Sequence, residues 1–192
     1  MNNFTVILDA NVLYPNFLRD ILMRLALTGL FRGRWTEDIH REWMRAVRLN
    51  RPDLDPVSIE RTRQLMDAHV LDALVTDYDG LIGGLELPDP DDRHVLAAAV
   101  KAQARLIITR NHKDFPESAL APHGIKTQGP DEFLLDLLQL DERLVLETME
   151  RHRTGLKKPP LTPLEYCQAL ERQELTLSAQ FVRQAWGLST HS

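Results

Sequence analysis

The sequence has few of the features that mark a secreted or membrane protein. It contains one cysteine in 192 residues, so no disulfide can form within the chain, and nothing around Cys167 has metal-ligand spacing. No apolar run approaches the roughly 20 residues of a membrane-spanning helix. The apolar run at residues 4–8 meets Asp9 too early to be a signal peptide. We therefore expect a protein of the reducing cytoplasm that does not enter a membrane.

Several common kinds of enzyme site are also missing. The seven histidines are scattered along the chain, and no Ser–His–acid pattern or glycine-rich phosphate loop occurs. Gly83-Gly84 is interpreted as a turn rather than a phosphate cradle. The sequence thus gives no support for a nucleophilic triad or a nucleotide-binding loop.

The formal net charge of -5 argues against a protein that coats nucleic acid through bulk electrostatics. The bases are nevertheless uneven, because residues 19–51 contain eight arginines and only four acids. Two interpretations remain open for this stretch: solvated helix faces, or a surface that contacts phosphates.

Strands and helices are predicted to alternate along residues 4–127. Residues 4–8 form an unbroken apolar run, which is typical of a strand buried on both faces. Such alternation implies right-handed βαβ crossovers and an α/β fold with a parallel sheet between helical layers. The other predicted elements are a helix ending near Gly29, an extended piece at Trp35, a helix capped by Thr36, a helix over 56–70, a helix starting at Asp89-Pro90, and strands over 71–75, 105–109 and 124–127.

Past Pro130 the chain has only helical signals. Helices are expected over 133–140 and 142–152, followed by a linker, a capping box at Thr162 and a last helix that ends near Gly187. We therefore predict an α/β domain over residues 1–136 and a helical appendage over 137–192. The appendage has more apolar surface than its helices can bury among themselves, so it must pack on the domain, on a second copy or on a partner.

Carboxylates from four separate segments are predicted to meet at one edge of the sheet, because an open parallel sheet binds ligands beyond the carboxyl ends of its strands. An all-oxygen set of this kind suits Mg²⁺ or Mn²⁺ rather than zinc, and the cluster needs a cation to stay ionised. The residues are Asp9 after the first strand, Glu42 in the helix after the second, Asp91 and Asp92 before the 105–109 strand, and Asn111 and Asp114 after it.

Each acid also has a purely structural interpretation. Asp89 before Pro90 is the better helix cap, which places Asp92 at the third helical position, facing inward with Val95 and in need of a partner. Asp9 can instead be a cap or turn former, Glu42 can pair with Arg41 or Arg45, and Asp114 can cap the next turn.

Four motifs, taken in order, resemble the PIN-domain ribonucleases, in particular the VapC-type toxins of bacterial toxin–antitoxin pairs. They are Val6-Ile7-Leu8-Asp9-Ala10-Asn11, Thr36 with Glu42, Asp92-Arg93-His94-Val95-Leu96-Ala97-Ala98-Ala99, and Ile108-Thr109-Arg110-Asn111 with Asp114. The resemblance covers about the first two-thirds of the chain.

This resemblance implies a three-layer α/β/α fold with one or two Mg²⁺ or Mn²⁺ ions. It implies Asp9, Glu42, Asp92 and an acid after Thr109 as catalytic residues. Many members have an acid where this chain has Asn111, so Asp114 is assigned as the ligand. The expected metal ligands are Asp9, Asp92 and Asp114, supported by Asn11, Thr109, Asn111 and Asp91, with a one-residue ambiguity between Asp91 and Asp92.

The function implied is a metal-dependent endoribonuclease, with a cognate antitoxin and a homodimeric assembly. Glu42 is expected either to bind metal or to orient the attacking water. The competing functions are a catalytically silent interaction module, a housekeeping RNA-processing enzyme, a DNA-structure nuclease and a phosphatase. For the phosphatase, Asp9-Ala10-Asn11 lacks the second acid that aspartyl-phosphate phosphatases have. Backbone phosphates are expected to contact Arg41, Arg45, Arg110 and Lys113.

Overall fold

The computed structural model describes residues 4–188 and contains a four-stranded parallel sheet in the order β2-β1-β3-β4. The central strands are β1 (Thr5–Leu8) and β3 (Leu106–Ile108), flanked by β2 (Arg32–Arg34) and β4 (Lys126–Gln128). Ile7 pairs with Ile107, and both side chains are fully buried. The predicted parallel α/β sheet is confirmed.

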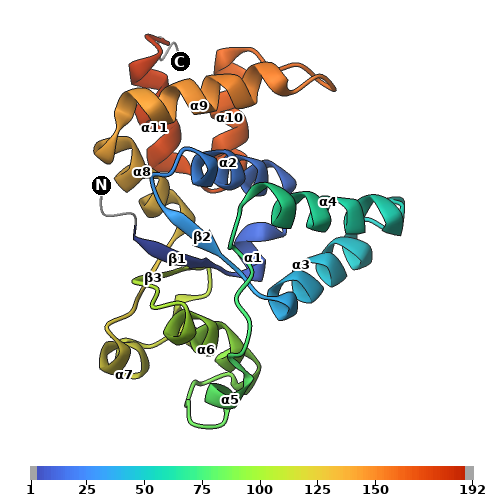
Figure 1. Ribbon diagram of the computed structural model, residues 1–192. Coiled ribbons are helices and arrows are strands. Elements are labelled where there is room, and N and C mark those ends of the chain that lie inside the picture. The colour runs from blue at the N-terminus through green and yellow to red at the C-terminus, as the bar shows by residue number, and fades with distance from the viewer. Residues whose placement is uncertain (1–3, 189–192) are drawn as a thin grey trace.

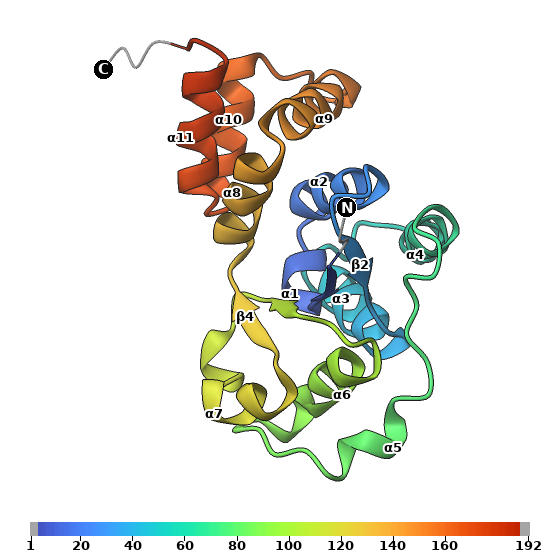
Figure 2. The same ribbon diagram turned by 60° about the vertical axis from the view of Figure 1, so that its left-hand side comes forward.

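Helices cover both faces of the sheet, and α6 and α2 lie on opposite sides of it (Figures 1 and 2). This gives the three-layer α/β/α arrangement. The helices of this part are α1 (Ala10–Leu13), α2 (Asn16–Leu27), α3 (Glu37–Asn50), α4 (Pro56–His69), α5 (Asp79–Ile82), α6 (Arg93–Lys101) and α7 (Glu117–Leu120), with the 3₁₀ turns η1 (Pro90–Asp92), η2 (His112–Asp114) and η3 (Ala121–His123).

The predicted strand over 71–75 is wrong. Only an isolated bridge between Trp35 and Leu74 forms there. Asp72 has a φ of 58°, in the left-handed region, and Leu71 is 80% exposed. The backbone therefore turns before a ladder can continue along the free edge of β2.

The C-terminal helices pack on the α/β domain rather than standing apart. They are α8 (Pro130–Leu140), α9 (Glu142–Gly155), α10 (Pro163–Arg172) and α11 (Thr176–Ala185). Phe17 of α2 lies against the rings of His152 and Tyr166, with centroids 4.9 and 5.4 Å away. Leu170 and Val182 are fully buried. The apolar surface of the appendage thus forms a further layer of the core.

Within residues 4–188, no helix combines the length and apolar character needed to cross a membrane.

Candidate metal centre

Asp9 occupies the carboxyl end of the central strand. Its backbone N–H donates to the Ile108 carbonyl at 3.1 Å and so extends the sheet by one residue. Its side chain is 5% exposed and accepts from the backbone N–H of Ala10 at 2.6 Å, which caps α1. The capping role considered for Asp9 is therefore real, and it fixes one carboxylate oxygen.

The second carboxylate oxygen of Asp9 is held by two polar side chains. The Thr109 hydroxyl donates to it at 2.6 Å, and the Asn11 amide donates at 2.5 Å. Asn11 also donates to the Thr109 hydroxyl oxygen at 2.8 Å. Burial raises the pKa of Asp9, and the charge of Glu42 adds to this, against the lowering effect of the bonds from Thr109 and Ala10. Asn11 and Thr109 therefore hold the Asp9 carboxylate by hydrogen bonds.

Three carboxylates form a compact cluster beside Asp9. One oxygen from each of Asp89, Asp92 and Asp114 lies within 4.8 Å of the others. Burial raises the pKa of Asp92 to about 6, and the charges of Asp9, Asp89 and Asp114 contribute to the rise. The cluster therefore carries uncompensated negative charge, which a divalent cation would relieve.

The structure places the predicted ligands in two groups. Asp92 and Asp114 lie in the cluster, whereas Asp9 is not one of its three members, and its oxygens accept hydrogen bonds from Ala10, Asn11 and Thr109. Asp114 accepts a short hydrogen bond from the Asn111 amide, so Asn111 positions this acid. Asp91 is exposed and contributes its backbone N–H to Asp89.

Asp89 has a second role besides the capping predicted from the sequence. It does cap the turn that precedes α6, because it accepts from the Asp91 N–H at 2.9 Å. It also joins the acidic cluster. The spacing of three residues between Asp89 and Asp92 could have predicted that both belong to the cluster, because residues three apart in a helical turn share a face.

Glu42 pairs with a histidine rather than with an arginine. His94 Nε2 lies 2.8 Å from Glu42 Oε1, and the His94 ring is buried. Arg41 bonds to Asp38, so the alternative in which Glu42 pairs with Arg41 does not hold in the structure. His94 was missed because the histidines are scattered along the sequence and show no ligand spacing.

Comparison with known proteins shows the family to which the chain belongs. Residues 5–113 match the model of the PIN domain. The chain belongs to the PIN-domain family. Residues 130–184 match the model of the VapC50 C-terminal domain, which begins at the first residue of α8, ahead of the boundary expected at residue 136.

A Mycobacterium tuberculosis protein bearing the name "Putative ribonuclease VapC50" is 45% identical over 82 residues. This match covers 43% of the present chain and 48% of that relative, so it spans about half the length of each protein. No solved structure gives a significant match.

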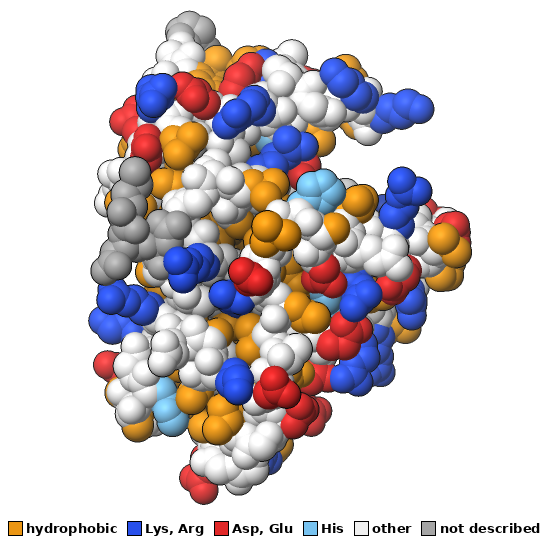
Figure 3. Space-filling view, in the orientation of Figure 1, with side chains coloured by type: hydrophobic (Ala, Val, Ile, Leu, Met, Phe, Trp, Pro, Cys, Tyr) orange, Lys and Arg blue, Asp and Glu red, His pale blue; other side chains and the backbone are white. Residues whose placement is uncertain are grey.

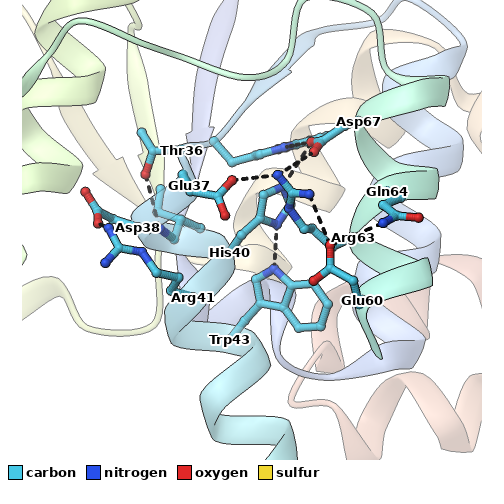
Figure 4. Close-up of polar contacts among 12 residues, drawn as sticks. Thr36, Glu37, Asp38, His40, Arg41, Trp43, Glu60, Arg63, Gln64 and Asp67 are labelled. Carbon is cyan, nitrogen blue, oxygen red and sulfur yellow. Dashed lines mark hydrogen bonds and ion pairs between the residues drawn. The ribbon is translucent and has the colours of Figure 1, made fainter. Parts of the chain in front are cut away.

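A largely buried network of hydrogen bonds fixes the PIN-domain helix that carries Glu42 (Figure 4). Trp43 Nε1 donates to His40 Nδ1 at 2.9 Å, so the other ring nitrogen of His40 carries the proton and donates to Asp67 at 2.9 Å. Trp35 Nε1 donates to the same Asp67 oxygen at 2.8 Å. Burial lowers the pKa of His40, which keeps the ring neutral. The network joins α3 to α4 and to the residue after β2.

The predicted phosphate contacts differ in their surroundings. Arg41, Arg45 and Lys113 are exposed, and Figure 3 shows basic and acidic side chains interspersed over the α3 and α4 side of the PIN domain. Arg110 is different, because its guanidinium bonds to the carbonyl of Gln173 at 2.8 Å and pairs with Glu174.

Proposed function

We propose that this PIN-domain protein is a metal-dependent endoribonuclease and the toxin of a toxin–antitoxin pair. The observation that carries the proposal is the cluster of Asp89, Asp92 and Asp114 beside the buried Asp9 at the carboxyl edge of the sheet. RNA as substrate is supported by the name of the Mycobacterium tuberculosis relative. A cognate antitoxin and a homodimer are part of the same proposal.

The residues present fit Mg²⁺ or Mn²⁺. The donors are carboxylate oxygens, which hard cations prefer. Burial and the neighbouring carboxylates raise the pKa of Asp92, and a bound cation would favour its ionised form. We propose Asp9, Asp92 and Asp114 as ligands, with Asp89 added to the set predicted from sequence. One or two bound ions would supply activation of a water molecule and neutralisation of phosphate charge.

The side chains of the protein then have separate tasks. Thr109 and Asn11 keep the Asp9 carboxylate in one orientation, and Asn111 does the same for Asp114. His94 holds Glu42, which either completes the ligand set or orients the attacking water. Backbone phosphates of the RNA would be bound by Arg41, Arg45 and Lys113, which are exposed.

Asp92→Asn is expected to stabilise the metal-free protein at neutral pH. The folded-state pKa of about 6 lies above the ordinary value of 3.8, so the folded protein binds this proton more tightly than the unfolded chain. The stability that the proton contributes is present below about pH 4 and lost as the pH rises through about 6. After allowance for solvent screening, the free energy of unfolding of the variant should exceed that of the wild type by about 1 kcal/mol at a pH of about 7.5. Urea unfolding in EDTA would measure this difference.

The same variant should lose both the rise in melting temperature with Mn²⁺ and the cleavage of RNA. Asp91→Asn is the matched control, because it changes the adjacent exposed carboxylate, and it should retain both. A wild-type protein that neither binds Mn²⁺ nor cuts RNA would favour the catalytically silent module. If Asp91→Asn instead lost both properties, Asp91 rather than Asp92 would be the metal ligand.

A further inference from the structure

Arg110 connects the candidate active site to the C-terminal helices. Its backbone N–H donates to Asn11 Oδ1 at 3.0 Å, and Asn11 in turn holds Asp9. Its guanidinium donates to the Gln173 carbonyl at 2.8 Å and pairs with Glu174. The two ends of one residue thus contact the nuclease site and the turn between α10 and α11.

This α10–α11 turn is itself firmly held. Glu174 has a φ of 60°, and its N–H donates to the Glu171 carbonyl at 2.8 Å. At the start of α11, the Asp131 carboxylate accepts from the backbone N–H groups of Leu177 and Ser178 at 2.8 and 2.9 Å. Asp131 therefore fixes the first turn of α11 to the first turn of α8.

The contacts return from α8 to the site. The backbone N–H of Thr109 donates to the Gln128 carbonyl at 3.1 Å, and Gln128 ends β4 just before α8 begins. Figure 2 shows β4 leading directly into α8, with α11 beside it. A closed ring of contacts thus runs from Thr109 through β4, α8 and α11 to Glu174 and back to Arg110.

We infer that the α10–α11 turn is a positioning element of the nuclease site. Gln173 and Glu174 hold the Arg110 side chain, which fixes the backbone N–H that orients Asn11 and, through it, the Asp9 carboxylate. The catalytic part of this inference rests on the proposed function, but the structural part does not.

The role is positional rather than stabilising. The Glu174 side chain is 80% exposed, and an ion pair in such surroundings contributes little to the free energy of unfolding. Loss of the Glu174 carboxylate should therefore leave the fold intact while loosening the residues around Arg110.

Glu174→Gly tests the inference cleanly, because glycine adopts the left-handed backbone without strain. Gln103→Gly is the matched control: Gln103 has a φ of 50° and precedes the amino end of β3, away from the site. We expect faster hydrogen exchange at the amides of residues 109–111 in Glu174→Gly alone. We also expect its kcat for RNA cleavage to fall about 10-fold with KM little changed.

The exchange measurement separates this inference from the proposed function, because it needs no catalytic activity. Should the wild-type protein cut no RNA, the proposed function fails while the amides still test the positioning. Arg110→Met should match the loss of kcat in Glu174→Gly, and the double variant should lose no more. The inference is overturned if Glu174→Gly behaves like Gln103→Gly in both measurements. A rise in KM confined to Arg110→Met would instead assign Arg110 directly to RNA phosphate and would equally overturn it.

Discussion

Asp9→Asn is expected to reduce RNA cleavage by more than about 100-fold while the fold remains intact. The substitution removes the carboxylate charge at the end of the central strand. It keeps the capping function at the start of α1, because asparagine and aspartate are equally good N-caps. Burial already raises the pKa of Asp9, so a neutral amide also removes the cost of an ionised group in this position.

Initial rates of cleavage, together with circular dichroism and the melting temperature, would measure this effect. Asp55→Asn is a suitable control, because Asp55 also caps a helix, accepting from the Val57 N–H at 3.0 Å, but lies on the exposed start of α4. The control should cut RNA at the wild-type rate. An Asp9→Asn protein within a few-fold of that rate would show that Asp9 takes no part in the chemistry.

Removal of all residues after Gly155 is expected to give an insoluble or molten fragment. Tyr166, Leu170 and Val182 are fully buried, and the Tyr166 hydroxyl lies 2.8 Å from His152 Nδ1. Burial of each such apolar side chain contributes about 1.5–3 kcal/mol, and a whole domain is stable by only about 5–15 kcal/mol. Without α10 and α11, the Phe17 ring would also lose its contact with Tyr166 and become exposed on that face.

Near-ultraviolet circular dichroism and the cooperativity of unfolding would detect this loss of packing. A milder pair of variants tests the same layer in the full chain. Tyr166→Ala should destabilise the protein by about 3–5 kcal/mol, whereas Tyr166→Phe keeps the ring and should cost far less. A truncated fragment that unfolds cooperatively and stays soluble would show that α10 and α11 are not part of the core.

Local sequence patterns were sufficient for the elements that place the site. An unbroken apolar run predicts β1 because a strand covered on both faces has no polar side, and Thr36 before the helical stripe predicts the cap of α3, where its hydroxyl accepts from Ile39 at 3.1 Å. The predicted strand over 71–75 was wrong because hydrophobic periodicity contains no information about the left-handed backbone at Asp72.

Long-range side-chain partners were beyond such patterns. His94 and Glu42 are 52 residues apart in the chain, and Arg110 and Glu174 are 64 apart. These two contacts depend on how the helices pack against one another, and the residue spacing within either segment does not predict them. Asp89 was missed for a different reason: one residue both caps a turn and joins the acidic cluster. Its position before Pro90 predicts the cap, and only its spacing to Asp92 points to the cluster.

The most direct measurement of the proposed chemistry is the structure of the RNA ends after cleavage. If a water molecule activated at the carboxylate site attacks the phosphate, the products carry a 5′-phosphate and a 3′-hydroxyl, and a 2′-deoxy substitution at the cut bond is tolerated. We expect these ends with the wild-type protein in Mg²⁺ or Mn²⁺, and no products in EDTA or with Asp92→Asn. Products that end in a 2′,3′-cyclic phosphate, or cleavage that continues in EDTA, would contradict a metal-dependent carboxylate nuclease.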